Sequence, residues 1–238
     1  MVTESNGRNE DRRADPVARL VVAGSPIPDA EALIRRYCGL PDESGERQVW
    51  GYHYFDARPS AADDEVTPED VSAAAVLNMR FARATLEGLL AARGVIREGL
   101  ERLPIDLSIE EASDEELDVI DDLLAGLCDG TGPYAFKIPE ATRAQISKVL
   151  HRKRPRLIPL YDRIIADRYA FGLGDKKLGR GRGFLEAVRD DLRLDDNRRT
   201  LGDIQARLGR DLDGSWIPSR LRLFDIAVWM DGMRGATG

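Results

Sequence analysis

The sequence predicts an all-α protein, mainly helical, with at most one short β element near residues 47–55. Two observations support this fold class. Apolar residues recur at the spacing of one helix face over 117–127 and again over 201–208. Residues typical of helix starts and stops divide most of the chain, and one aromatic, β-prone run, RQVWGYHYFD, lies between them.

The first helix boundaries follow from capping residues. Asp29 is the expected N-cap of a short helix in DAEALIRRYCG, and Gly39 is its expected stop. Thr67 as N-cap, with Pro68 at the first helical position, opens the alanine- and leucine-rich segment TPEDVSAAAVLNMRFARATLEGLLAARG. This segment is expected to form either a buried central helix or two closely spaced helices.

The next predicted helix is the most acidic one. Ser113 and Glu116 have the spacing of a capping box, and Gly130 is placed to end the helix. From Asp106 to Asp129 the chain has ten acidic residues and no basic one. We interpret these acids as a solvated face, because their spacing does not require them to converge on a metal ion.

Helical patterns also cover the C-terminal third of the chain. They are DRIIADRYAFG, GFLEAVRDDL, TLGDIQARLG and the closing WIPSRLRLFDIAVWMDG, in which Leu221, Phe224 and Val228 share one apolar stripe. The glycine-rich GLGDKKLGRGRG is neither a P-loop nor a dinucleotide fingerprint, so its two interpretations are a surface loop and a phosphate-contacting loop. No cofactor is predicted.

The totals limit the protein class. Hydrophobic residues make up 42% and charged residues 32% of the 238 residues, as in globular proteins. The chain has no apolar run long enough for a membrane span and no N-terminal apolar segment typical of a secretory signal, so we expect a cytoplasmic protein with no membrane partner. Two cysteines and two histidines make a disulfide scaffold or a multi-histidine site implausible, and no metal is predicted.

The expected organisation is a flexible tail over 1–24 and a single helical domain over 25–238. Within this domain an acidic half, 25–141, precedes a basic half, 142–238. Residues 1–141 carry 14 basic and 29 acidic side chains, a balance of −15, and the remaining residues carry 21 and 13, a balance of +8. This split indicates two halves that neutralise each other, or a basic face for a polyanion.

The basic residues concentrate in KIPEATRAQISKVLHRKRPRLIPLYD, residues 137–162. A turn should lead into a helix whose apolar residues face the core and whose cations lie on the exposed sides. Mobile cations near a helix N-terminus are suited to phosphate. The candidate nucleic-acid-binding residues are Arg143, Lys148, Arg152, Lys153, Arg154 and Arg156. The alternative is that these cations pair with the acidic segment 106–129.

Four segments, YFDARP, EVTPEDVSAAAVLNMR, SKVLHRKRPRLIPLYDR and LRLFDIAVWM, resemble an uncharacterised bacterial domain-of-unknown-function family, number 6308. The resemblance covers most of residues 50–230 and implies no activity. More distantly, IPEATRAQISK is similar in length to the hairpin of helix-hairpin-helix DNA glycosylases, with Ile138 and Pro139 at that hairpin's Leu-Pro. This second resemblance implies a glycosylase-like helical scaffold, DNA as a partner and a catalytic aspartate at Asp162.

The hairpin departs from that family at functional positions. Glu140 and Thr142 stand where the family has glycines, which permit a tight turn and the close approach of phosphate. Ala144 stands where the bifunctional enzymes have their Schiff-base lysine, and Lys148 lies one helical turn further on. The resemblance therefore implies at most a residual, aspartate-dependent hydrolysis.

Asp162 has two roles compatible with the sequence. It could act as a catalyst if it lay partly buried beside a substrate pocket, and it could cap the helix that starts at DRIIADRY. Three hypotheses follow: a nucleic-acid-binding module with or without hydrolysis at Asp162; a non-enzymatic interaction or structural protein whose basic half pairs with its own acidic helix; and a small-molecule enzyme that uses Asp162 and Tyr161. Whether the chain is an enzyme stays open at this point.

Overall fold

The structure is a computed structural model that describes residues 19–41, 53–58, 60, 64–77, 79–172, 181–212 and 216–235. Over these residues it contains eleven helices and one two-stranded antiparallel sheet, which confirms the all-α fold class with a short β element. The elements are β1 (Leu20–Val22), β2 (Ser25–Ile27), α1 (Ala30–Tyr37), α2 (His53–Ala57), α3 (Pro68–Val76), α4 (Arg83–Ala91), α5 (Arg93–Glu101), α6 (Asp114–Asp129), α7 (Arg143–Lys153), α8 (Arg163–Gly172), α9 (Arg182–Arg193), α10 (Asp195–Asp211) and α11 (Arg220–Gly235).

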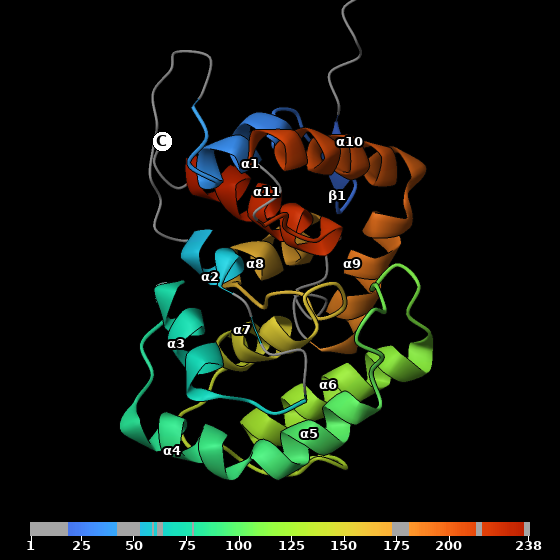
Figure 1. Ribbon diagram of the computed structural model, residues 1–238. Helices are drawn as coiled ribbons and strands as arrows, with labels where there is room; N and C mark the ends of the chain where they lie inside the picture. The colour runs from blue at the N-terminus through green and yellow to red at the C-terminus, as the bar shows by residue number, and fades with distance from the viewer. Residues whose placement is uncertain are drawn as a thin grey trace, which may run out of the picture.

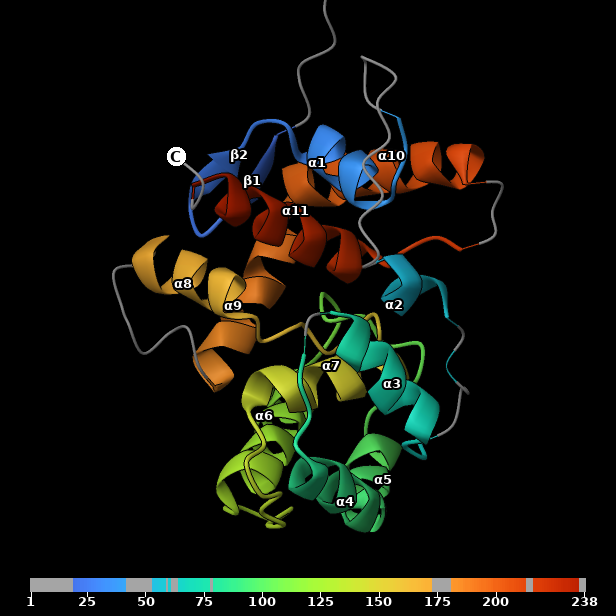
Figure 2. The ribbon, with the colours of Figure 1, turned by 90° about the vertical axis from the view of Figure 1, so that its left-hand side faces the viewer.

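The elements form two halves, one above the other in Figures 1 and 2. The upper half contains β1, β2, α1, α8, α10 and α11, and the lower half contains α3 to α7. In the upper half α1 packs on α11 and β1 packs on α10, while α9 contacts both α10 and the lower-half helix α6. The upper half is therefore built from the first and the last described segments of the chain.

A side chain of α10 ties the N-terminal strand into the upper half. The Asn197 amide accepts a hydrogen bond from the Val21 backbone N at 2.7 Å and donates one to the Val21 O at 2.6 Å. These two bonds satisfy backbone groups of a strand that has only one neighbour in its sheet. Residues 19–24 of the expected tail are part of the described fold, because Leu20 and Val22 are fully buried in β1, and residues 1–18 lie outside the described residues.

The β element lies elsewhere in the chain than expected. The described sheet is the hairpin of β1 and β2, at 20–27, with Val21 opposite Pro26. Of the predicted stretch 47–55, residues 47–52 lie outside the described residues, and His53–Ala57 form the short helix α2. The clustered aromatic residues predict a strand there by local propensity alone. Local propensity contains no information about tertiary contacts, so it does not exclude a helix.

The helix boundaries agree with the capping signals. The Thr67 and Ser113 side chains accept hydrogen bonds from the backbone N of the residue three positions later, and both capping boxes are complete. Gly130 ends α6 in the left-handed conformation, with φ of 75°. Thr142 starts α7 in the same way, through a capping box with Gln145.

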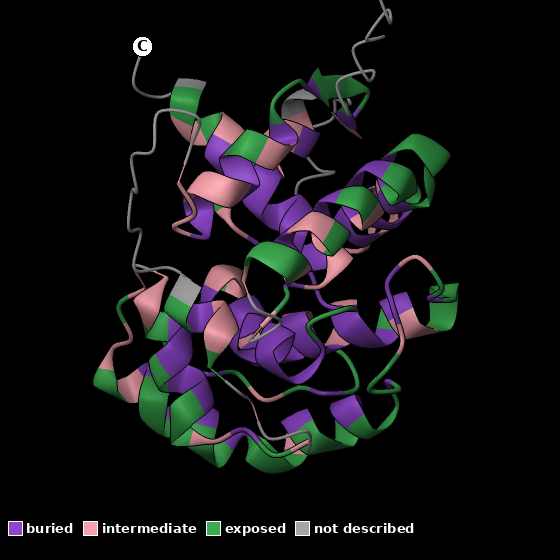
Figure 3. Cartoon of the chain, turned by 45° about the horizontal axis from the view of Figure 1, so that its top comes forward, coloured by how far each residue is buried: buried purple, intermediate pink, exposed green. Residues whose placement is uncertain are grey.

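Helix α7 lies in the interior of the molecule. Its apolar residues Ile146, Val149 and Leu150 are fully buried, as predicted, and α7 packs on α3 and α6. Buried residues gather toward the middle of the molecule in Figure 3. Every residue from 145 to 154 is buried, so the expectation that Lys148, Arg152 and Lys153 lie on exposed sides is wrong.

Candidate functional site

Arg152 and Lys153 bind oxygen atoms of the neighbouring helices α2 and α3. The Arg152 guanidinium donates to the carbonyl oxygens of Phe55 (2.6 Å) and Arg58 (2.9 Å), at the end of α2. Lys153 Nζ lies 2.7 Å from Oδ2 of Asp70, and Arg152 Nε lies 3.5 Å from Oδ1 of the same carboxylate. The Lys153 side chain is 0% exposed. Both cations therefore act as internal ties between helices.

Arg154 has the same role at the end of α5. Its guanidinium donates to the carbonyl oxygens of Leu100 and Leu103, each at 2.7 Å, and it also binds the carboxylate of Asp64. The last carbonyl groups of a helix have no partner within the helix and carry partial negative charge, so a cation stabilises them. An exposed phosphate-binding face made of residues 152–154 is thus contradicted by their burial. The helical pattern could not reveal this, because it separates polar from apolar residues but does not show which polar residues find buried acceptors.

Arg143 and Arg156, the outer members of the predicted set, have different surroundings. The Arg143 guanidinium pairs with Asp121 at 2.9 Å and Asp129 at 3.5 Å on the acidic helix α6. Arg156 is exposed. It lines a cavity of about 860 Å³ together with Arg152 and Lys153.

The acidic helix α6 is neutralised in part by cations from the basic half of the chain. Arg182 lies 3.1 Å from Asp114 and 2.6 Å from Asp118, and Arg189 lies 2.8 Å from Asp114. Of the predicted cations, Arg143 pairs with the acidic segment as the alternative expects, whereas Arg152, Lys153 and Arg154 bind Asp70 and Asp64. Arg182 and Arg189, which also pair with α6, belong to α9.

Asp162 lies at the start of α8 and caps that helix. Its Oδ1 accepts a hydrogen bond from the Ile164 backbone N at 3.0 Å, and its carbonyl oxygen accepts one from the Ala166 N at 2.9 Å. Its Oδ2 lies 3.7 Å from Nζ of Lys148. The Asp162 side chain is 25% exposed, whereas that of Lys148 is 4% exposed. Capping thus occupies one carboxylate oxygen, and the other faces a buried amine.

A pocket of about 330 Å³ opens beside Lys148 and Asp162, and we call it the Asp162 pocket. Most of its walls are apolar, and they come from α1, the segment after α3, the start of α8 and α11. Its other lining residues are Tyr37, Leu77, Met79, Leu160, Arg163, Ile164, Ile165, Arg222, Ile226, Trp229 and Met233. A mostly apolar pocket with a few convergent polar groups is the usual form of a small-molecule site.

The electrostatics of Lys148 are set by this environment. Burial lowers the pKa of the Lys148 amine below its usual value, and the nearby Asp162 carboxylate opposes this shift by favouring the charged form. The amine also donates to the carbonyl oxygen of Leu77 at 3.4 Å. Perturbed amines in pockets are common at functional sites.

Tyr161 and His151, two polar residues of the stretch 137–162, have structural roles. The Tyr161 hydroxyl donates to the Gly181 O at 3.0 Å, its ring packs on Phe184 at 4.5 Å between centroids, and it does not line the Asp162 pocket. His151 Nδ1 lies 2.6 Å from the Ile158 O, and burial lowers the pKa of His151 to about 4. A neutral, buried imidazole donating to a carbonyl stabilises the turn after α7.

Arg222 is a functional candidate that sequence reasoning missed. Its guanidinium binds both oxygens of Asp56, at 2.6 Å and 3.1 Å, and donates to the Tyr37 hydroxyl. It is also within 5.4 Å of the ring centroid of Phe55. Arg222 lines both the Asp162 pocket and the larger cavity. The sequence signal that could have found it is the spacing of Arg222 and Asp225. They lie three residues apart on an apolar helix, which puts two charges on one buried face.

Two further searches concern the described residues only. In that part of the chain no group of three or more histidine, cysteine, aspartate or glutamate side chains is placed to hold a metal ion. None of its helices is long and apolar enough to cross a membrane.

The fold and site define a helical protein with a lysine–aspartate pair at the wall of an apolar pocket. The profile of one protein family, described as "Family of unknown function (DUF6308)", matches residues 30–232, so the chain belongs to this family. No curated protein and no solved structure shows a significant match. The resemblance to helix-hairpin-helix glycosylases is therefore supported by none of the comparisons.

Proposed function

We propose that the chain binds nucleic acid and that the Asp162 pocket receives a single ring from it. The observation that carries this proposal is the meeting of Lys148 and Asp162 in a pocket with apolar and aromatic walls. Proteins that act on a base hold it in such a pocket, between apolar or aromatic side chains and a few polar groups. A pocket of about 330 Å³ is at the lower end of the range for small-molecule sites, which suits one ring.

Asp162 is the group that acts on the inserted ring or its sugar. Its Oδ2 is not used by the helix cap and lies 3.7 Å from Nζ of Lys148. A carboxylate in this position accepts a proton from water. In hydrolysis, the water oxygen bonds to the sugar carbon, the bond to the base breaks, and the base leaves with the bonding electrons. Lys148 holds the carboxylate in place.

Phosphate contacts come from exposed cations beside the pocket. Arg163 follows Asp162 directly, is exposed and lines the pocket. Of the six predicted phosphate-binding residues, Lys148 and 152–154 are buried and Arg143 pairs with α6, so Arg156 is the exposed member. Because phosphate binding releases counterions, affinity should fall steeply with salt.

The test is binding of labelled single- and double-stranded oligonucleotides, followed by fluorescence anisotropy from about 50 mM to 200 mM salt. We expect binding that Arg163→Gln weakens and that Arg97→Gln, an exposed arginine on α5, leaves unchanged. Asp162→Asn should keep binding and lose hydrolysis, since asparagine retains the oxygen that caps α8. Failure to retain either oligonucleotide at low salt would refute the proposal.

A second candidate is a non-enzymatic interaction or structural protein. The ion pairs of α6 with Arg143, Arg182 and Arg189 favour it, because they use cations of the basic half without any external anion. This candidate predicts that no oligonucleotide is bound and that Asp162→Asn has no effect other than on stability. The same binding experiment separates the two functions.

A further inference from the structure

The cavity of about 860 Å³ that Arg156 lines is a second site, separate from the Asp162 pocket. Its walls are contributed by the end of α2, the loop after α5, the end of α7, the middle of α10 and the start of α11. Among its lining residues six are basic and two are acidic: Arg58, Arg152, Lys153, Arg156, Arg220 and Arg222 against Asp56 and Asp106. This surplus of positive charge occurs in a chain with a net charge of −7. We call it the cationic cavity.

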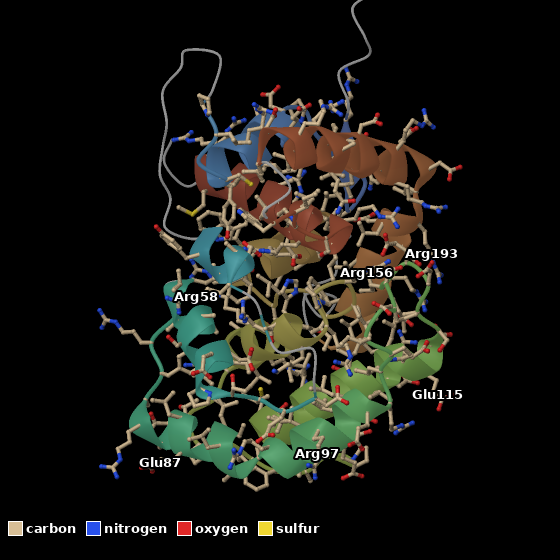
Figure 4. All side chains as sticks on the ribbon, viewed as in Figure 1. Arg58, Glu87, Arg97, Glu115, Arg156 and Arg193 are labelled. Carbon is tan, nitrogen blue, oxygen red and sulfur yellow. The ribbon has the colours of Figure 1, made fainter. Side chains whose placement is uncertain are left out.

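Four of these six cations already have carboxylate partners. Arg152 and Lys153 bind Asp70, Arg222 is paired with Asp56, and Arg220 lies 3.4 Å from Glu110. Arg58 and Arg156 are exposed, and no ion pair joins either to a carboxylate of the described residues, although the charge of Arg156 also acts on the Glu111 carboxylate. Figure 4 shows both at the level where the two halves meet, whereas Arg97 lies on the outer side of the lower half. Arg58 and Arg156 are thus available to an anion in the cavity.

Hydrogen bonds of Ser219 fix one part of the cavity wall before any ligand binds. The Ser219 hydroxyl donates to the Pro155 O at 2.6 Å and accepts from the Arg222 N at 3.1 Å, so it joins the end of α7 to the start of α11. Ser219 and Arg220 line the cavity at this helix start. The free amides of a helix's first turn add positive potential to the cations. A rigid site loses little entropy on binding.

Part of the rim of the cavity is apolar. Ile105 and Ile217 are 40% and 44% exposed, although large apolar side chains are usually covered, and Pro155 and Pro218 lie on the same lining. A ligand that combines several negative charges with a flat ring would match both parts of the cavity. Inorganic phosphate would use the arginines alone and would leave the rim exposed.

We propose that the cationic cavity binds a small organic polyphosphate of the nucleoside di- or triphosphate class. Its phosphate groups lie on Arg58 and Arg156, and its ring covers Ile105 and Ile217. This assignment does not depend on nucleic-acid binding at the Asp162 pocket. The shared wall residue, Arg222, places the two sites next to each other.

The test is isothermal titration calorimetry of the full chain with ATP in EDTA, at constant ionic strength. We expect saturable binding that Arg58→Gln and Arg156→Gln each weaken by about tenfold, the worth of one charge-assisted hydrogen bond. Both residues are exposed, so both variants should keep the wild-type melting temperature. Inorganic tripolyphosphate should bind more weakly than ATP, and Ile217→Ser should remove that difference.

The controls distinguish this site from the Asp162 pocket. Arg97→Gln, Arg163→Gln and Asp162→Asn should leave ATP binding unchanged, even where the last two alter oligonucleotide binding or hydrolysis. The proposal is overturned if ATP shows no saturable binding up to about 1 mM, or if Arg97→Gln weakens it as much as Arg58→Gln. It is also overturned if an oligonucleotide, and not ATP, is the ligand that depends on Arg58. Equal affinity for tripolyphosphate and ATP would overturn the placement of the ring on the rim.

Discussion

Asp225 is a buried acid whose ionisation should control the stability of the upper half. It is 0% exposed in α11, its Oδ2 accepts from the Leu160 N at 3.2 Å, and its Oδ1 has no hydrogen-bond partner among the described residues. Burial raises the pKa of Asp225 from an ordinary 3.8 to about 7, and the opposing charge of Arg222 does not prevent this. The reason is that the Arg222 guanidinium is bound to both oxygens of Asp56.

The sign of the pH effect follows from the raised pKa. A carboxyl group with a higher pKa in the folded than in the unfolded state favours folding below the unfolded pKa, and this contribution is lost as pH rises through the folded pKa. At about 1.4 kcal/mol per pKa unit, a shift of about three units amounts to roughly 4 kcal/mol. Between pH 5 and pH 8 the folded protein should lose roughly 2–3 kcal/mol of this stabilisation.

The variant Asp225→Asn removes the ionisation and keeps an acceptor for the Leu160 N. Urea unfolding of both proteins at pH 5, 6, 7 and 8 should show the variant gaining about 2–3 kcal/mol relative to wild type across this range. Asp231→Asn, on the same helix but 25% exposed, is the matched control and should not show this gain. Parallel pH profiles for Asp225→Asn and wild type would refute the reasoning, because Asp225 would then be ionised in the folded protein throughout.

Three other perturbations test the fold. Arg154→Gln should lower the free energy of unfolding by about 3 kcal/mol in urea titration, because it removes a buried cation from its acceptors. The control Arg156→Gln should change the free energy of unfolding by less than about 0.5 kcal/mol, and equal effects of the two variants would contradict the burial of Arg154. Gly126→Ala should lower the free energy of unfolding by about 1–3 kcal/mol, since the added methyl group meets the Tyr134 carbonyl. An unchanged melting temperature would show that Gly126 and the Tyr134 carbonyl lie farther apart. Glu140→Gly should stabilise by roughly 0.5 kcal/mol, because Glu140 has a φ of 57°, and a lower melting temperature would contradict a left-handed backbone there.

The candidate site was predictable in part. Asp162 could be placed at a helix start from LIPLYDR alone, and the structure confirms that it caps α8. The partner of its second oxygen could not be predicted, because Lys148 was read as exposed on a helix that looked amphipathic. Residues 145–154 are all buried, so the cations among them have protein oxygens as neighbours. The nucleic-acid-binding role of the basic run was inferred from charge, which does not show where a side chain ends.

The sequence by itself determined the fold class, the N-cap at Thr67, the capping box at Ser113 and the end of α6 at Gly130. These features depend on residues within one or two helical turns, so local spacing is sufficient to specify them. Only the tertiary structure decided that β1 packs on α10, that Arg154 closes the end of α5 and that Arg222 lies between two cavities. Each of these contacts joins residues at least 50 positions apart. Such contacts depend on how complete helices pack, which local patterns do not encode.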